Sequence, residues 1–329
     1  MKKSKKINAP PVSVIIPMRN SSTTVLETLK SIVRQNYPIR EIIIVDNVSK
    51  DNSREIVRVF AKKSPIRMRL LLQKKDKGVS SSYNWGLREA KTQLVVFLTS
   101  DCTLPTQDEL EKLVKPLIKD PLAVASYSTC TLPRFVWDTY NFWEKFFSAR
   151  MVDNISSGMV LKFDCVKKLS FLSIGGFDEI NFGGDSAIGG EDADLSTRLR
   201  KIGKIVRSKA HSFHLHYKGL DYNLFNMARS RKMYARSQGR FLRKWGLSIK
   251  DACFAFLPRP LIAISGIFIV GLPMLVLYSF LYTPRMFTTR ETLLNPRIIT
   301  IPFLNIAFLY YELYWLIRAF LSYKKKAII

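Results

Sequence analysis

The chain has 329 residues, enough for one sizeable domain and an appendage. Its hydrophobic content of 47% supplies a packed core and excludes a wholly disordered chain. Lysine and arginine total 52 against 26 aspartate and glutamate, a formal net charge of +26. Such an excess predicts polyanionic partners, among which composition alone does not choose: nucleic acid, anionic lipid or phosphorylated substrates.

The cysteines and the first residues bear on the compartment. The four cysteines are widely scattered and form no CxxC pair, which favours a reducing compartment over a disulfide framework. Residues 1–11 carry four lysines and no apolar run before Val12, unlike a secretory signal. We therefore expect the N-terminal domain to stay in the cytosol.

Short β-branched runs alternate with helical stretches from residue 12 to about residue 127. Near-continuous apolar strands separated by helices are typical of a parallel sheet covered on both faces. Ligands bind beyond the carboxyl ends of the strands in such sheets. Four runs are predicted as strands: Val12–Ile16, Glu41–Asp46, Met68–Leu72 and Leu94–Thr99.

Polar residues follow these predicted strands. Pro17 and Asn20 come after the first strand, Asp46 ends the second, and Asp101 follows the fourth. An aspartate at a strand end binds a base or a ribose hydroxyl, or it caps the next helix, and the pattern leaves both open. Gly78 opens a segment that suits close approach of the backbone to an anion.

Three carboxylates open a predicted helix after a glycine-rich run. Glu191, Asp192 and Asp194 follow Gly189–Gly190. They either complement the helix dipole or form an acid/base site. All three histidines lie within residues 211–216, which suggests a metal or phosphate site.

The composition changes after Asp221. From there to Asp251 the chain has eight basic residues interleaved with aromatics, which indicates either a membrane-surface helix or an ordinary solvated face. Leu261–Tyr282 and Ile298–Leu321 are each long enough to cross a bilayer core of about 30 Å, with two buried core helices as the alternative. Two spans would place the linker Thr283–Arg297 across the membrane from the N-terminal domain.

In this order and spacing, the motifs over residues 12–217 resemble the family 2 glycosyltransferases. The resemblance implies the GT-A fold, a Rossmann-like, mainly parallel sheet that binds a nucleotide-diphosphate sugar. It implies Asp192 as the general base of an inverting transfer, with Glu191 and Asp194 supporting the acceptor or the active site. It implies a Mg²⁺ or Mn²⁺ ion held by Asp101 and His216, with His214 as the second choice. The donor-binding residues that it implies are Pro17, Asn20, Asp46, Gly78, Asn84 and Asp101.

Two positions depart from the family pattern. Thr99 stands at the first aspartate of the Asp-x-Asp metal motif, and Tyr83 stands where an arginine is frequent before Asn84. Both departures bear on metal affinity and on donor identity.

The resulting hypothesis is a multi-pass enzyme of the cell membrane, with its catalytic domain facing the cytosol. It transfers a sugar to a lipid-linked or polyprenyl-linked glycan and binds no nucleic acid. The alternatives are a polyprenyl-phosphate glycosyl synthase and a non-catalytic sugar-nucleotide-binding scaffold. The expected segments are a basic tail (1–11), a GT-A domain (12–220), a basic amphipathic interface segment (221–258), a two-helix transmembrane hairpin (259–323) and a basic tail (324–329).

Overall fold

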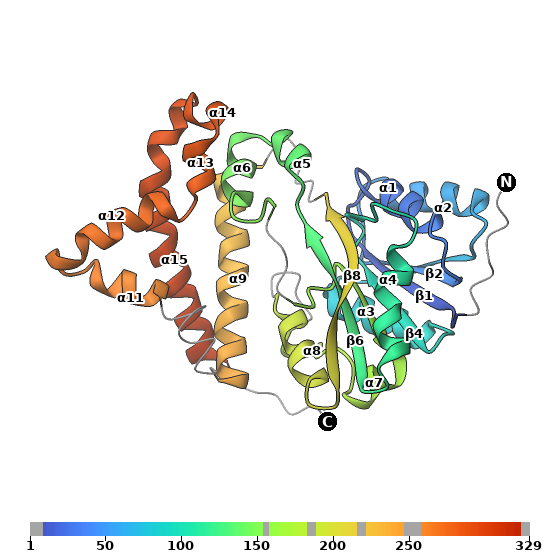
Figure 1. Ribbon diagram of the computed structural model, residues 1–329. Coiled ribbons are helices and arrows are strands. Elements are labelled where there is room, and N and C mark those ends of the chain that lie inside the picture. The colour runs from blue at the N-terminus through green and yellow to red at the C-terminus, as the bar shows by residue number, and fades with distance from the viewer. Residues whose placement is uncertain (1–8, 154–157, 183–188, 216–221, 247–257, 324–329) are drawn as a thin grey trace.

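The computed structural model describes residues 9–153, 158–182, 189–215, 222–246 and 258–323. It places an α/β domain beside a C-terminal group of helices (Figure 1). The α/β domain holds an eight-stranded sheet in the order β3-β2-β1-β4-β7-β6-β8-β5. The strands are β1 (Val12–Met18), β2 (Ile39–Asp46), β3 (Met68–Leu72), β4 (Leu94–Leu98), β5 (Cys102–Thr103), β6 (Ala123–Thr131), β7 (Phe163–Lys167) and β8 (Lys204–His214).

One half of the sheet is parallel and the other half is mixed. Strands β3, β2, β1 and β4 pair in parallel. β7 runs antiparallel to both β4 and β6, whereas β8 returns parallel to β6. The register Met18↔Asp46 places the carboxyl ends of β1 and β2 side by side. The expected mainly parallel sheet of an α/β domain is therefore confirmed.

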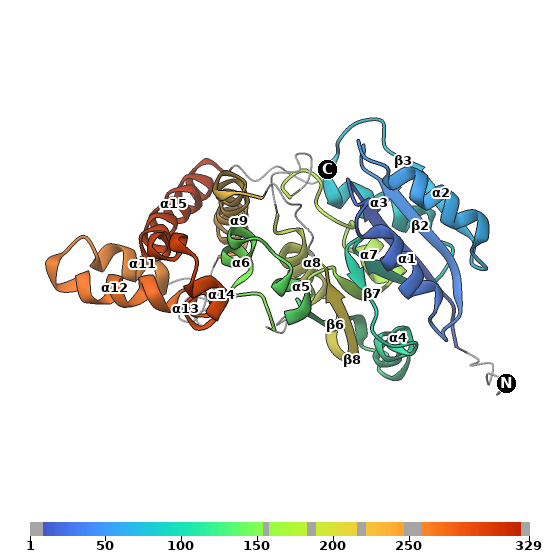
Figure 2. The same ribbon diagram turned by 90° about the horizontal axis from the view of Figure 1, so that it is seen from above.

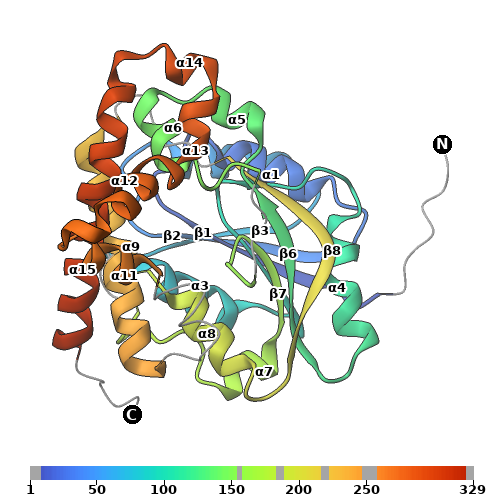
Figure 3. The same cartoon turned by 60° about the vertical axis from the view of Figure 1, so that its left-hand side comes forward.

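Helices cover both faces of this sheet because alternate residues of a strand point in opposite directions. Val14 and Ile16 of β1 face one hydrophobic cluster, and Ile15 faces the other. Figure 3 shows α1 above the strands and α3, α7 and α8 below them. A Cβ added at Gly86 would lie 2.5 Å from Ile15 Cγ2, so α3 packs directly on β1. The helices are α1 (Val25–Val33), α2 (Ser53–Lys63), α3 (Gly78–Glu89), α4 (Glu109–Lys119), α7 (Lys168–Ser173) and α8 (Glu191–Leu199).

The C-terminal group joins two long helices to several short ones. α9 (Leu224–Trp245) lies within the basic segment, and its first turn is capped by Asn223, whose side chain accepts a hydrogen bond from Asn226 N at 3.1 Å. α15 (Ile301–Ser322) packs along it (Figures 1 and 2). The short helices of this group are α11 (Pro258–Ser265), η2 (Ile269–Gly271), α12 (Leu272–Leu281), α13 (Pro284–Thr288), α14 (Arg290–Leu293) and η3 (Pro296–Thr300). Two short helices of the catalytic domain, α5 (Arg134–Asp138) and α6 (Phe142–Ser148), lie beside it (Figure 1).

Only the second predicted span forms a continuous helix. Pro296–Ser322, with 27 residues, is the one helix among the described residues that is long and apolar enough to cross a membrane. Leu261–Tyr282 is instead divided into α11, η2 and α12, which fold back on each other. The reversal is tight, since a Cβ at Gly271 would lie 1.9 Å from Ser265 O, and α12 restarts with Pro273 in its first turn. The expectation of two continuous spans is therefore corrected to one candidate.

Candidate active site

The carboxyl ends of β1 and β2 carry the predicted donor residues Pro17, Asn20 and Asp46. Asn20 has a left-handed backbone (φ 49°), and it ties the two strand ends together. Its N–H donates to Ser49 Oγ at 3.0 Å, and its Oδ1 accepts from Lys50 N at 2.8 Å. Asn20 therefore fixes the shape of this edge through its own backbone and side chain.

Asp46 is fully buried at the end of β2. Its Oδ2 accepts from Ser49 N at 3.2 Å and pairs with Arg54 at 2.7 Å. Its Oδ1 is buried and has no hydrogen-bond partner among the described residues. A buried carboxylate oxygen without a donor is costly, so this oxygen is suited to accept a hydrogen bond from a bound ligand.

The third strand leads to Gly78 and Asn84 on α3. Gly78 has φ 77°, and its N–H donates to Asp76 Oδ1 at 3.0 Å. Asn84 accepts from Phe177 N at 2.8 Å and donates to Phe177 O at 3.0 Å and to Glu179 Oε1 at 2.7 Å. Asn84 thus uses its amide to hold the turn that leads to the acidic helix. Gly78 lies at the N-terminus of α3, where backbone N–H groups favour an anion.

The predicted metal residue Asp101 lies between β4 and β5, opposite His214. His214 is brought there because β5 pairs with the end of β8, in the register Cys102↔His214. Asp101 Oδ2 lies 3.0 Å from His214 Nε2, and ligand atoms of Asp101, Cys102 and His214 lie within 4.8 Å of one another. The structure therefore brings the second-choice histidine to Asp101. The first choice, His216, lies outside the described residues.

This group fits a divalent ion through two of its three members. Carboxylate and imidazole are both ligands of Mn²⁺-type sites. The third member is a poor ligand, because burial raises the pKa of the Cys102 thiol and keeps it protonated. Thr99, at the position of the missing aspartate, donates to Cys102 Sγ at 3.0 Å. Asp101 and His214 are thus the residues that would hold an ion here.

Lys162 lies at the same place, and sequence reasoning missed it. Its ammonium is 3.2 Å from His214 Nε2. Burial alone would lower the pKa of Lys162, but the Asp101 carboxylate beside it raises that pKa, so the ammonium stays charged. Lys162 comes just before β7 and belongs to no family motif that the sequence displayed. A fixed positive charge therefore lies where a ligand diphosphate would bind, and a divalent ion would use His214 Nε2 only by displacing this ammonium.

Tyr83 holds the backbone that aims Lys162. The residue before Lys162, Leu161, has φ 60°, which is unusual for a residue with a side chain. Tyr83 is fully buried, and its hydroxyl donates to Leu161 O at 3.0 Å. Leu161 N donates in turn to Asp164 Oδ2 at 2.6 Å, and burial raises the pKa of Asp164 to about 8. Tyr83, which stands where the family pattern often has an arginine, thus holds the backbone next to Lys162.

The acidic helix α8 separates its three carboxylates. Asp194 is buried and pairs with Arg198 at 2.7 Å and Lys244 at 2.6 Å, which joins α8 to α9. Glu191 and Asp192 are half-buried at the first turn. Asp192 Oδ1 accepts from Ala193 N at 2.7 Å, whereas Glu191 Oε2 has no partner among the described residues. Asp194 is therefore held in ion pairs, whereas Glu191 and Asp192 make no ion pair among the described residues.

The electrostatics of α8 suit an acid/base function. Burial and the neighbouring Asp192 carboxylate raise the pKa of Glu191 to about 7. Burial also raises the pKa of Asp192, and the Lys162 ammonium opposes the rise at both carboxyls. Because the Lys162 ammonium also interacts with the Asp101 carboxylate, the charges of these four side chains act on one another. The site combines a fixed cation, a candidate ion position and a carboxylate with perturbed basicity.

Comparisons with known proteins bear on the family and the fold. The sequence model described as glycosyl transferase family 2 matches residues 13–164. The chain is 32% identical over 110 residues to glycosyltransferase AglE of Haloferax volcanii, covering 33% of this chain and 36% of that protein. It is 30% identical over 112 residues to the Escherichia coli enzyme named UDP-Glc:alpha-D-GlcNAc-diphosphoundecaprenol beta-1,3-glucosyltransferase WfgD, covering 34% and 43%. The chain thus matches well under two thirds of the length of these relatives.

Two solved structures share the fold. The mannosyltransferase PcManGT of Pyrobaculum calidifontis, in complex with GDP-Man and Mn²⁺, superposes with a TM-score of 0.59 at 20% identity, covering 95% of this chain and 90% of that one. GalNAc-T7 with UDP, GalNAc and Mn²⁺ gives a TM-score of 0.54 at 18% identity, covering 77% and 51%. At these identities the likeness concerns the fold.

Proposed function

We propose that this chain is a family 2 glycosyltransferase, which transfers a sugar from a nucleotide-diphosphate sugar to a lipid-linked or membrane-proximal glycan. The observation that carries the proposal is that the buried Lys162 ammonium interacts electrostatically with the carboxylates of Asp101, Glu191 and Asp192. It offers positive charge for a departing diphosphate and a carboxylate for an incoming hydroxyl. Both are needed when a glycosidic bond is exchanged.

We propose that the donor lies across the edge formed by β1, β2 and β4. The free Oδ1 of Asp46 accepts from the nucleoside, and the N-terminus of α3 at Gly78 faces the diphosphate. Pro17 and Asn20 shape the loop between them. Asp101 and His214 would hold a divalent ion, which stabilises the negative charge of the departing diphosphate. Mn²⁺ in the two related structures supports this assignment.

The transfer itself breaks the bond from the anomeric carbon to the diphosphate and forms one to the acceptor oxygen. The acceptor attacks from the face opposite the leaving group, so the configuration inverts. Its proton passes to the Asp192 carboxylate as the new bond forms. The Lys162 ammonium faces the charge that develops on the diphosphate. Glu191 shapes the electrostatic environment of Asp192 from the same helical turn.

The acceptor and the compartment are proposed on other grounds. The name of WfgD gives a diphosphoundecaprenol-linked acceptor, and the apolar C-terminal helices of this chain suit an acceptor held at a membrane. The thiols of Cys102 and Cys130 are within hydrogen-bond reach of each other, a pairing that a reducing compartment preserves. We therefore propose that the catalytic domain faces the cytosol.

One experiment tests the reaction class. The purified full chain is incubated with membrane lipid extract, Mn²⁺ and a panel of radiolabelled nucleotide sugars, and label is counted in the organic phase. We expect label from one donor, and none from the same donor with Asp192→Asn. Donor binding without transfer for every donor and extract would instead identify a sugar-nucleotide-binding scaffold.

A further inference from the structure

We propose that residues 258–323 form a monotopic membrane wedge: the chain enters one leaflet and returns to the same face, and no described segment crosses the bilayer. The proposal concerns how the protein sits on a membrane, and it holds whichever sugar is transferred. Three observations carry it. They are the contacts of the linker between the apolar segments, the neighbour of α15, and the shape of the α11–α12 hairpin.

The linker is bound to the catalytic domain. Arg285, on α13, pairs with Asp153 at 2.9 Å and donates to Val152 O at 3.2 Å. Glu291, on α14, pairs at 2.5 Å with Lys145, whose side chain is buried. A two-span hairpin would place α13 and α14 about 30 Å away, beyond the hydrocarbon core. Figure 1 shows both helices beside α6, so this linker lies on the same side as the catalytic domain.

α15 has a basic helix along its length. Arg231 of α9 pairs with Glu312 at 2.6 Å, and Lys232 of α9 lies 3.8 Å from the centre of the Trp315 ring. A Cβ at Gly239 would lie 2.2 Å from Leu316 O, so the two helices are in direct backbone contact. If α15 crossed the bilayer, α9 would carry its lysines and arginines to the same depth. Cations at that depth are strongly disfavoured, so α9 and α15 are better placed in the membrane plane.

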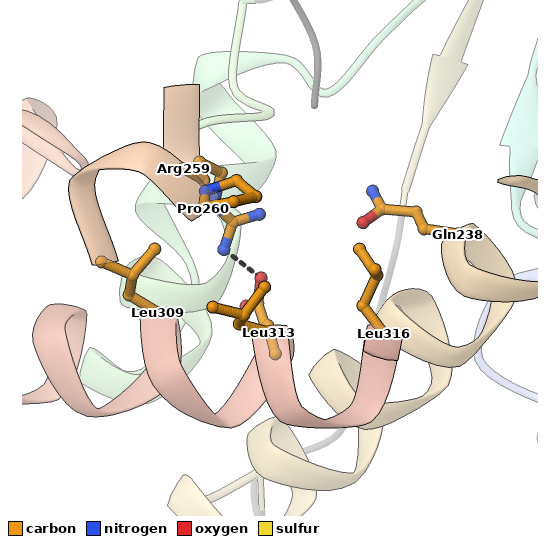
Figure 4. Close-up of a pocket in the computed structure, with 7 residues that line it drawn as sticks. Gln238, Arg259, Pro260, Leu309, Leu313 and Leu316 are labelled. Atoms are coloured by element: carbon orange, nitrogen blue, oxygen red, sulfur yellow. Dashed lines mark hydrogen bonds and ion pairs between the residues drawn. The ribbon is translucent and has the colours of Figure 1, made fainter. Parts of the chain in front are cut away.

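The acidic residue of α15, Glu312, lies near the middle of the helix. Glu312 also pairs with Arg259 of α11, which gives an Arg231–Glu312–Arg259 group where α9, α11 and α15 meet. Figure 4 shows the Arg259 ion pair beside a small cavity lined by Gln238, Pro260 and leucines of α15. A charged group at this point suits a helix at the head-group level, where water and phosphates are near.

The α11–α12 hairpin supplies the part that enters lipid. Its tip, residues 267–270, is entirely apolar and exposed, with Ile269 85% and Val270 93% accessible. The tip points away from the sheet, across the direction in which α9 and α15 run (Figures 1 and 2). The ten residues of α12 span about 15 Å at 1.5 Å per residue, about half of a hydrocarbon core. The hairpin therefore reaches into one leaflet only.

The occupant of this surface is one leaflet of an anionic bilayer. Apolar side chains along α11 and α12, such as Leu261, Leu277 and Leu281, are also more than half exposed. A contiguous exposed apolar surface such as this hairpin marks a site of contact with a protein or a membrane. The exposed cations Arg229 and Arg243 on α9 add charge that complements anionic head groups.

Cysteine labelling tests the topology. One cysteine at a time is added at Thr288 in the linker, at Ile269 in the tip or at Lys63 in the catalytic domain of a Cys253→Ser full-length chain in sealed vesicles. The Cys253→Ser parent, whose remaining cysteines are buried, is labelled in parallel as the background. Above this background, an impermeant maleimide should label T288C and K63C from the same side, and I269C only after the membrane is dissolved in mild detergent. Labelling of T288C exclusively from the side opposite K63C would show a two-span hairpin and overturn the proposal.

Vesicle flotation tests the tip. The Ile269→Asp/Val270→Asp double variant should lose at least tenfold in binding to phosphatidylglycerol vesicles. The matched control, Leu122→Asp/Leu169→Asp, changes two exposed apolar residues of the catalytic domain and should float like the wild type. Donor binding in detergent, measured for each variant, reports folding separately from membrane binding. A folded double variant that floats normally would contradict insertion of the tip.

Discussion

At the residue scale, Asp192 and Asp194 share one helix but have different surroundings. Asp194 is paired with Arg198 and Lys244, whereas Asp192 makes no ion pair among the described residues and interacts with the charge of Lys162. We expect Asp192→Asn to lower transfer by about 10²–10⁴-fold while donor affinity stays near wild type, because a general base acts on the acceptor. Single-turnover transfer and donor titration measure the two effects. If the variant turns over as fast as the wild type, Asp192 is not the general base, and Glu191 becomes the candidate.

The raised pKa of Asp192 gives a pH prediction. The base works only when deprotonated, so kcat/KM should fall as the pH drops through a value above the ordinary carboxyl range. The Lys162 ammonium opposes the rise, so Lys162→Met should move this acidic limb to still higher pH as well as weaken donor binding. Lys162→Arg, which keeps the charge, is the control. If the acidic limb of kcat/KM lies at the same pH in Lys162→Met as in the wild type, the charge of Lys162 does not act on the base, and this prediction is wrong.

The ion site makes a prediction of its own. Asp101→Ala should weaken Mn²⁺ binding and, with it, donor binding, since the Asp101 carboxylate is the acidic member of the Asp101–His214 pair. Calorimetric titration of Mn²⁺ with and without donor gives a readout apart from turnover. Full activity in excess chelator would mean that no metal ion is needed and that the Lys162 ammonium stabilises the negative charge of the departing diphosphate by itself.

At the element scale, strand-end reasoning located Asp46 and Asp101 because a parallel sheet brings such ends together whatever the loops do. The same reasoning could not find Lys162. Its position depends on the left-handed Leu161 and on a hydrogen bond from Tyr83, a residue far away in the sequence. The roles of the site residues stay predictions.

The apolar C-terminal segments show another limit of sequence reasoning. Composition and length are the same for a spanning helix and for a hairpin. What decides between them here is the tight reversal at Gly271 and the ion pairs of the linker, which depend on the fold of the rest of the chain.

The junction of α8 with α9 can be tested through Gly190. This residue has φ 97°, and a Cβ there would lie 2.3 Å from Ser237 Oγ on α9. Gly190→Ala should therefore lower the free energy of unfolding by about 1–3 kcal/mol, through both backbone strain and the close contact. Ser237→Ala in the same chain should recover part of the loss by removing Oγ. Urea unfolding of the four proteins of this double-mutant cycle measures the coupling, and purely additive effects would contradict the contact.

At the whole-molecule scale, the catalytic domain and the basic segment are expected to meet at residue 220, but buried ion pairs join the two segments in the structure. Lys244, near the end of α9, donates to Asp178 at 2.8 Å and to Asp194 at 2.6 Å, and all three side chains are buried. Trp245 Nε1 also donates to Asp194 at 3.0 Å. The basic helix that lies on the membrane is thus built into the active-site wall, so membrane docking and the geometry of α8 depend on one another.

Removing Lys244 tests this dependence. Lys244→Met leaves the Asp178 and Asp194 carboxylates buried without their common cation, and breaking a buried pair in this way costs about 3–5 kcal/mol. Lys232→Met, on the same helix but beside Trp315, removes an equal charge without leaving a buried carboxylate unpaired, so it is the matched control.

The same ion pair makes the stability depend on pH. Burial opposes ionisation of Asp178, but hydrogen bonding to Lys244 lowers the pKa of Asp178 below its ordinary value. That pairing stabilises the fold above the unfolded-state pKa and is lost as the pH falls through the folded-state pKa. In urea unfolding near neutral pH, the free energy of unfolding of Lys244→Met should therefore be well below that of the wild type. The difference between the two free energies should become smaller in acid. If Lys232→Met destabilises the chain as much as Lys244→Met, the loss reflects the charge of α9 as a whole, and the active-site wall does not depend on this one residue.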